Sequence, residues 1–173
     1  DGNFPTCPYP NPEIFEALRL GLELAEKSGA DLMLATDPDA DRVGIAVKCK
    51  DGSYELLSGN EVGVLLLDYL IGAMKRAGRL PAQPVALKTI VTTEMARKVA
   101  QVNGLACYDT FTGFKFLAEK KDQLEGSGAG NVIFSYEESY GYMLGDYVRD
   151  KDAVTASLLL TAMAAWYHGQ AMT

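Results

Sequence analysis

The amino-acid sequence predicts an α/β fold: a three-layer α/β/α sandwich around a mixed, mostly parallel sheet, together with a partial second α/β unit. From residue 51 onward, short apolar runs of strand length alternate with longer segments whose apolar residues recur at helical spacing. Before residue 51, one helical segment is followed by only two apolar runs. Such alternation is typical of a sheet covered by helices. We therefore expect two units, residues 1–50 and 51–173.

The composition describes an acidic globular chain. Its 173 residues include 16 Lys and Arg against 23 Asp and Glu, a formal net charge of -7, and 48% are hydrophobic. This length supports one core, or one core and part of another. The acidic balance argues against nucleic-acid binding, which needs a basic surface on the protein. Phosphate binding would depend on a few cations gathered in one cleft, for which the candidates are Arg42, Lys88, Lys115, Arg149 and Lys151.

Cysteine, histidine and hydropathy exclude several classes of protein. Cys7, Cys49 and Cys107 are scattered and form no C-x-x-C pair, so we expect no disulfide framework or zinc site, and a reducing cytoplasm. The longest apolar run, residues 153–167, is too short and too interrupted to span a bilayer, and we expect no membrane association. The single histidine, His168, leaves acid–base chemistry to Lys, Asp, Glu or Tyr.

The first unit should contain one helix and two strands. Asn11 and Pro12 form an N-cap and first-turn pair for a helix that runs to Ser28. The apolar runs at residues 31–35 and 43–47 predict buried strands, with a tight polar connection between them.

The second unit should continue the alternation to the end of the chain. Asp51 and Gly52 predict a hairpin turn, and residues 58–61 match a capping box that opens a helix ending before Gly78. Further helices are expected at residues 94–102, 114–123 and 152–167, and strands at residues 53–57, 85–91, 106–108 and 132–136.

Three aspartates alternate in the connection between the two strands of the first unit. In a nearly extended loop, the carboxylates of Asp37, Asp39 and Asp41 can converge on one hard cation, Mg²⁺ or Mn²⁺. The alternative is a solvated acidic turn. A calcium-binding EF-hand is excluded, because the sixth position is Arg42 rather than Gly and the twelfth is Lys48 rather than Glu.

Arg42 places a planar, five-donor cation directly after this triad, where a phosphate oxygen could contact both; alternatively, it only neutralises the aspartates. With this arginine, the run A-T-D-P-D-A-D-R-V-G-I-A-V resembles the metal-binding loop of the α-D-phosphohexomutases, the phosphoglucomutase/phosphomannomutase family. The resemblance implies one Mg²⁺ per active site, held by the three aspartates.

A second motif, T-F-T-G-F-K-F-L at residues 110–117, is similar to a T-G-x-K segment in the third domain of that family. The resemblance implies that Lys115 lies near the transferred phosphoryl group, where it would move a proton or stabilise charge. Thr112 and Gly113 would then contact the substrate. Without that resemblance, Lys115 is a lysine on a helix surface.

A third motif, Y-E-E-S-Y-G-Y at residues 136–142, resembles the family's sugar-recognition loop. By this resemblance, Glu137 and Ser139 bind adjacent hydroxyls of a sugar phosphate; alternatively, the motif is an ordinary polar turn. The chain departs from the commoner family pattern at Tyr136, where that pattern has Gly. The following G-D-Y-V-R-D-K-D-A resembles the branch of bacterial phosphoglucomutases and phosphopentomutases, so a pentose phosphate also fits.

Three other cations border these motifs. Lys88, in A-L-K-T-I-V-T-T, matches a segment that the family places at its cleft, so we expect it to contact substrate; the alternative is a surface lysine at a strand end. Arg149 and Lys151 either face the cleft or pair with neighbouring aspartates as a charged cap before the last helix.

The resemblance covers nearly the whole chain: residues 1–50 as the C-terminal part of domain II and residues 51–173 as domain III. It implies an enzyme that moves a phosphoryl group between the C1 and C6 hydroxyls of a hexose, or C5 of a pentose, through a phosphoserine and a bisphosphate. The phosphoserine loop and the distal phosphate clamp belong to other domains of the family. We therefore expect an inactive fragment whose partners are the missing domains of its parent chain.

Two alternatives remain from the sequence. A haloacid-dehalogenase-type phosphatase would use Asp37 as nucleophile, since L-M-L-A-T-D-P-D is a hydrophobic strand ending in D-x-D, but this leaves Arg42 and the E-E-S run unexplained. The other alternative is a noncatalytic sugar-phosphate binding module. The preferred sugar, the oligomeric state and metal binding without the phosphoserine domain stay open.

Overall fold

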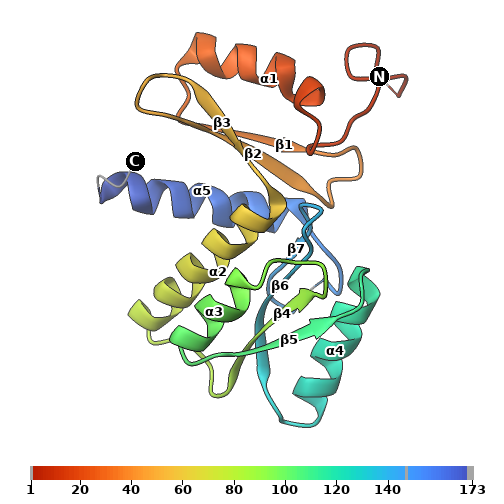
Figure 1. Ribbon diagram of the computed structural model, residues 1–173, viewed down its shortest axis with the longest axis vertical. Coiled ribbons are helices and arrows are strands. Elements are labelled where there is room, and N and C mark those ends of the chain that lie inside the picture. Colours follow the sequence, from red (N-terminus) through yellow and green to blue (C-terminus); the bar gives the residue numbers. More distant parts are fainter. Residues whose placement is uncertain (1, 147, 171–173) are drawn as a thin grey trace.

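The computed structural model describes residues 2–146 and 148–170. Figure 1 shows two sheets stacked along the long axis of the molecule, with helices around and between them. The helices are α1 (Phe15–Ser28), α2 (Gly59–Arg76), α3 (Met95–Val102), α4 (Phe114–Gly126) and α5 (Ala153–Gly169). The strands are β1 (Leu32–Thr36), β2 (Val43–Lys48), β3 (Tyr54–Leu57), β4 (Pro84–Thr89), β5 (Ala106–Thr110), β6 (Asn131–Tyr136) and β7 (Tyr142–Met143).

The larger sheet has the order β5-β4-β6-β7, with β4 parallel to β5 and β6, and β7 antiparallel to β6. Successive residues of β4 point to opposite faces. Ala86 packs in the main core with residues of α2, α3 and α5. Val85 and Leu87 pack with Phe114 and Leu117 of α4 on the other face. The sheet therefore lies between two helical layers, which confirms the expected α/β fold.

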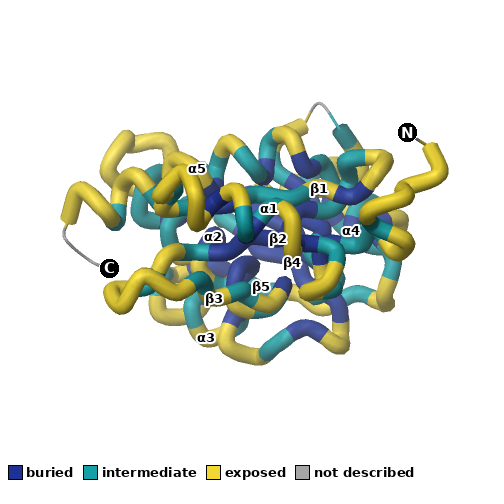
Figure 2. The backbone as a smooth tube through the Cα atoms, turned by 90° about the horizontal axis from the view of Figure 1, so that it is seen from above, coloured by how far each residue is buried: buried dark blue, intermediate teal, exposed yellow. Residues whose placement is uncertain are grey.

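The smaller sheet is antiparallel, in the order β1-β2-β3. On one face, Met33 and Ala46 pack beneath Leu18 and Leu22 of α1. On the other face, Ile45 of β2 belongs to the main core that α5 shares. Figure 2 shows the buried residues gathered in the interior, and the two sheets share a core because Ile45, Ala86 and Leu160 of α5 belong to one cluster.

Helix α5 is apolar on most of its surface and lies between the two sheets (Figure 1). Its buried residues include Ala156, Leu160 and Met163. The helix begins after Asp152, whose carboxylate accepts hydrogen bonds from the amides of Val154 at 3.1 Å and Thr155 at 3.2 Å. Among the residues that the structure describes, no helix is both long and apolar enough to cross a membrane.

The start of α1 differs from the sequence-based expectation. Asn11 is not its N-cap: the side-chain oxygen of Asn11 accepts from the amide of Glu13 at 3.0 Å and closes a local turn. The helix begins only at Phe15, after Ile14, which provides no side-chain cap. The Asn-Pro pair was a cue for a turn as much as for a helix, because asparagine hydrogen-bonds readily to the backbone two residues on.

Strands β4 and β7 also differ from the sequence-based expectation. Strand β4 ends at Thr89 rather than at residue 91, since the amide of Thr92 donates to the carbonyl of Thr89 at 3.1 Å and turns the chain. Ile90 and Val91 are therefore exposed despite their apolar character. The two-residue strand β7 was not expected; pairing with β6 creates it, and so short a strand has no periodicity of its own.

The chain passes from the smaller sheet to the larger one at Ser58. Strand β3 still pairs with β2, and α2 begins immediately afterwards. The expected capping box is confirmed, because the Ser58 hydroxyl accepts from the Glu61 amide while the Glu61 carboxylate accepts from the Ser58 amide. The expected division at residues 50 and 51 stays a prediction.

Candidate active site

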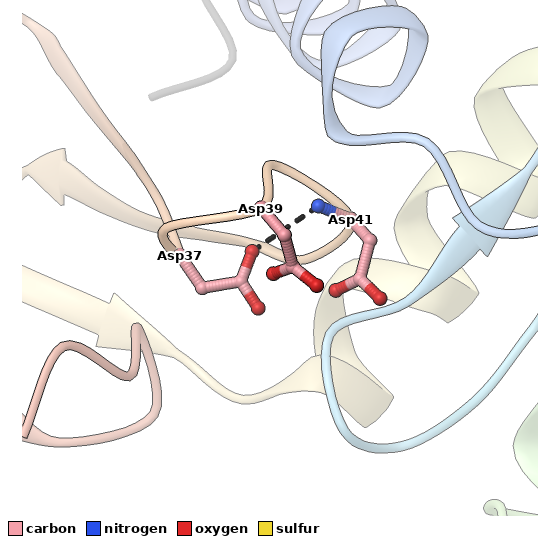
Figure 3. A group of neighbouring side chains, drawn as sticks. All are labelled: Asp37, Asp39 and Asp41. Atoms are coloured by element: carbon pink, nitrogen blue, oxygen red, sulfur yellow. Dashed lines mark hydrogen bonds between the residues drawn. The ribbon is translucent and has the colours of Figure 1, made fainter.

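The three aspartates lie in the loop between β1 and β2, and their carboxylates converge (Figure 3). One carboxylate oxygen from each of Asp37, Asp39 and Asp41 lies within 4.8 Å of the other two. Asp37 is buried, Asp41 is half-buried and Asp39 is exposed, so the cluster opens toward solvent on one side. Three carboxylates at this spacing are a donor set suited to a hard divalent cation.

Asp37 is fixed by hydrogen bonds from its own loop. Its Oδ1 accepts from the amides of Asp41 at 3.2 Å and Arg42 at 3.1 Å, and its Oδ2 accepts from Arg42 Nε at 2.6 Å. Figure 3 shows the bond from the Asp41 amide. Burial opposes the charged form, but the Arg42 side chain and amide outweigh it and lower the pKa of Asp37. Asp37 is therefore held as an ionised carboxylate.

Lys151, which precedes α5, reaches the loop that carries the three aspartates, residues 37–42, called the metal loop below after its predicted role. Its Nζ lies 3.0 Å from Asp41 Oδ2 and 5.9 Å from the ring centre of Phe114. Burial and the charge of Asp37 raise the pKa of Asp41 despite the bond from Lys151. Of the two cations left open by the sequence, Lys151 faces this site, whereas Arg149 contacts Asp122 on α4 at 2.9 Å.

The metal loop is joined through its backbone to the loop at residues 136–142, called the recognition loop below after its predicted role. Arg42 forms an isolated antiparallel bridge with Gly141, and the amide of Val43 donates to the carbonyl of Tyr140 at 3.1 Å. Gly141 is packed so closely that a Cβ there would lie 2.7 Å from Cδ of Lys151. Two motifs about a hundred residues apart in the chain thus form one continuous surface.

Glu137 links the recognition loop to the T-G-F-K segment. Its amide donates to the carbonyl of Gly141 at 2.9 Å, and its Oε1 accepts from the amide of Gly113 at 2.6 Å. Burial raises the pKa of Glu137, although the Gly113 amide opposes this shift. The carboxylate therefore connects the loop to the beginning of α4.

Other predicted site residues lie on the margin of this surface. Ser139 is half-buried in the recognition loop, and Thr112 and Lys115 are exposed beside Gly113. The ammonium of Lys115 rests 4.8 Å from the ring centre of Phe116 on the same helix. The structure brings these residues to the same end of the sheet, and their contact with substrate stays a prediction.

Lys88 requires a correction, because it is neither a surface lysine nor free to bind a substrate. Its side chain is buried, and Nζ lies 2.9 Å from both Glu94 Oε1 and Asp109 Oδ1. Burial lowers the pKa of Lys88, but these two carboxylates outweigh burial and raise it. The ammonium is occupied by ion pairs inside the protein.

Sequence reasoning missed the second glutamate of the recognition loop. Glu138 Oε2 accepts from the hydroxyl of Thr89 at 3.0 Å, and the Glu138 carbonyl lies against Gly59, where a Cβ would approach it to 2.0 Å. The available signal was the second glutamate of the E-E-S run. Gly59 gave no signal, because its requirement comes entirely from this contact.

Comparison with known proteins agrees with this arrangement. The family model for phosphoglucomutase/phosphomannomutase alpha/beta/alpha domain III matches residues 58–172, and that for domain II matches residues 1–52. A phosphoglucomutase from Staphylococcus aureus is 39% identical over 165 residues, which are 95% of this chain and 29% of that protein. The chain thus spans less than a third of the length of these curated relatives.

Solved structures share the fold. A phosphoglucomutase/phosphomannomutase family protein from Burkholderia thailandensis superposes with a TM-score of 0.68 at 22% identity, over 92% of this chain and 31% of that one. N-acetylphosphoglucosamine mutase from Aspergillus fumigatus, in complex with GlcNAc-6P and magnesium, superposes with a TM-score of 0.60 at 15% identity, over 85% of this chain and 37% of that one. The chain belongs to the phosphoglucomutase/phosphomannomutase family and corresponds to its domains II and III.

Proposed function

We propose that this chain is part of a mutase that moves a phosphoryl group between the C1 and C6 hydroxyls of a hexose phosphate, or C5 of a pentose phosphate, through a phosphoserine and a bisphosphate. The main support is the docking of the metal loop onto the recognition loop by the Arg42–Gly141 bridge and the Val43–Tyr140 hydrogen bond. In this proposal the aspartates would hold a cation beside the groups that would bind the sugar hydroxyls, as phosphoryl transfer on a sugar requires.

The three aspartates fit Mg²⁺. Ligand oxygens around Mg²⁺ are about 3 Å apart when adjacent and about 4 Å apart when opposite, given metal–oxygen distances of about 2 Å. Carboxylate oxygens of Asp37, Asp39 and Asp41 within 4.8 Å of one another need only small side-chain shifts to reach that spacing. When bound, the ion would stabilise negative charge on a phosphoryl oxygen.

The remaining residues would orient the sugar phosphate and move protons. Glu137 uses Oε1 for the Gly113 amide, and we assign Oε2 and the Ser139 hydroxyl to neighbouring sugar hydroxyls. We assign Lys115, with Thr112 and Gly113, to the transferred phosphoryl group, where an exposed ammonium can donate a proton to an oxygen. Arg42 holds Asp37 through Nε and adds positive charge beside the metal loop.

The geometry of Asp37 argues against the phosphatase alternative. Both of its oxygens accept hydrogen bonds, and its side chain is only 1% exposed. A nucleophilic aspartate needs an oxygen lone pair free to attack phosphorus, and the hydrogen bonds to both oxygens of Asp37 oppose that role. A noncatalytic sugar-phosphate binding module would use the same hydroxyl-binding residues, so turnover is the property that separates it from a mutase.

The test is an assay of the longer polypeptide that contains this sequence. We expect Mg²⁺-dependent interconversion of the phosphate esters of glucose, mannose or ribose, lost on Asp39→Ala and retained on Asp68→Ala, an exposed aspartate of α2. The 173-residue chain by itself should bind sugar phosphate weakly without turnover. Turnover by this chain alone would contradict the proposal that catalysis needs groups from other domains. Binding without turnover by the longer polypeptide would favour the noncatalytic binding module.

We place the protein in the cytoplasm and its other active-site groups in further domains of the same parent chain. The three cysteines are free, which supports a reducing compartment.

A further inference from the structure

A buried ammonium closes the turn that follows β4. Lys88 Nζ donates to the carbonyl of Thr92 at 3.1 Å and contacts that of Thr89 at 3.3 Å, in addition to its two carboxylate partners. The side chains of Lys88, Thr89 and Thr92 are all at most 4% exposed. Burying the charged ammonium of Lys88 costs free energy unless its hydrogen-bond and ion-pair partners are all in place. The turn is therefore a rigid element at the carboxyl end of the sheet.

The two threonine hydroxyls of this turn form a directed chain. Thr89 Oγ1 lies 2.6 Å from Thr92 Oγ1 and 3.0 Å from Glu138 Oε2. A hydroxyl has one proton, and a carboxylate can only accept, so the proton of Thr89 points to Glu138. Thr89 must then accept from Thr92. The order of donation is Thr92 to Thr89 to Glu138, with no freedom to reverse.

Glu138 is one of two neighbouring glutamates that attach the recognition loop to different elements. Glu137 contacts the beginning of α4 through Gly113, and Glu138 contacts the end of β4 through Thr89. The loop is thus held on both sides at the residues that precede Ser139. Losing either attachment would remove one of the two side-chain anchors of the loop.

We propose that Thr89 is a positioning residue for sugar recognition: its hydroxyl, oriented by Thr92 and the Lys88-closed turn, holds Glu138 and thereby fixes the loop that presents Glu137 and Ser139. This inference rests on the proposed function for its link to sugar, and on geometry alone for its link to the loop. The two parts can therefore be tested separately.

The first measurement is amide hydrogen exchange by NMR on the 173-residue chain. Thr89→Val keeps the shape and removes the hydroxyl, and we expect exchange of the Glu137 and Val43 amides, which bond to the recognition loop, to rise about tenfold. The Ala46 amide in β2 should not change. Thr89→Ser restores the hydroxyl and should exchange like the wild type, as should Thr161→Val, the same change at an exposed position of α5.

The second measurement is a titration with glucose 1-phosphate, followed by the shifts of the loop amides. Binding should weaken about tenfold in Thr89→Val and recover in Thr89→Ser. If Thr89→Val does not fold, Thr92→Val tests the same series of hydrogen bonds, one hydrogen bond further from Glu138.

The possible outcomes separate the two parts of the inference. Loop exchange equal to the wild type in Thr89→Val, or an equal rise at Ala46, would overturn the positioning role. A loosened loop in Thr89→Val, with no sugar phosphate bound by the wild type, would support the positioning role and count against the proposed function.

Discussion

The ring of Tyr136 lies directly against the α carbon of Gly63. A Cβ built on Gly63 would lie 2.1 Å from Cε2 of that ring, a distance at which one of the two elements must move. The ring is only 1% exposed and stacks on Phe134 with their centres 5.6 Å apart. Helix α2 and the strand leading into the recognition loop therefore meet at a contact that has room for no side chain on the helix.

Gly63→Ala should destabilise the protein by about 2 kcal/mol, because the added methyl overpacks the Tyr136 ring. Gly72→Ala is the matched control on the same helix, where the new Cβ meets only the flexible end of Arg76 at 3.0 Å. That change should be neutral or stabilise by up to about 1 kcal/mol, because alanine favours the helix. Urea unfolding measures both, and equal effects at the two positions would contradict the packing argument.

Asp39→Asn should weaken Mn²⁺ binding about tenfold, because it removes one charged ligand from the cluster. Asp39 is exposed, so stability should change by less than about 0.5 kcal/mol. Electron paramagnetic resonance of free Mn²⁺ gives the affinity, with Asp68→Asn as control. If both variants bind Mn²⁺ like the wild type, the aspartates form a solvated turn and not a metal site.

Lys151→Met should strengthen Mn²⁺ binding by the chain about fivefold, because a partly exposed cation 3.0 Å from Asp41 is worth roughly 1 kcal/mol against a second cation. The same variant should bind sugar phosphate more weakly, because a positive charge is lost. Arg149→Met, which removes a cation paired with Asp122 instead, should change neither affinity. Parallel changes in both variants would mean that only net charge matters.

Glu137→Gln should make the protein more stable at neutral pH while it weakens sugar binding. Burial raises the folded-state pKa of Glu137 above its unfolded value, so the unfolded chain loses its proton first as pH rises. The contribution of Glu137 to wild-type stability should therefore fall from the unfolded pKa, about 4.3, up through the folded one. The advantage of Glu137→Gln should vanish below pH ~4, as measured by urea unfolding across pH; a constant difference would refute the assignment.

The pair Glu94→Gln and Asp109→Asn, made together, should cost about 3 kcal/mol, because the buried ammonium of Lys88 then has no charged partner. Lys88→Met should cost less, since both carboxylates reach solvent and retain Arg97 as partner. Asp122→Asn, which removes an exposed ion pair with Arg149, serves as control and should change the free energy of unfolding by no more than about 0.5 kcal/mol. Urea midpoints decide the order, and a larger loss for Lys88→Met would reverse the argument.

Patterns of residues close together in the sequence were enough to predict most helices and strands and the metal loop. The capping box at Ser58 was visible because a cap and its helix lie within four residues. The alternation of Asp37, Asp39 and Asp41 likewise predicts convergence from backbone geometry alone. Asn11 misled because the same side chain can cap a helix or close a turn, and only the neighbouring structure selects between them.

The sequence by itself determined the α/β alternation, the composition of the metal and recognition loops, and the family. Only the tertiary structure decided that Arg42 docks on Gly141, that Lys151 and not Arg149 faces the metal loop, and that Lys88 is buried. The first two are contacts between residues that the chain separates widely, and Lys88 combines nearby partners with the distant Asp109. No local periodicity encodes them, because each depends on which strands are neighbours in the sheet and on how closely backbones approach there.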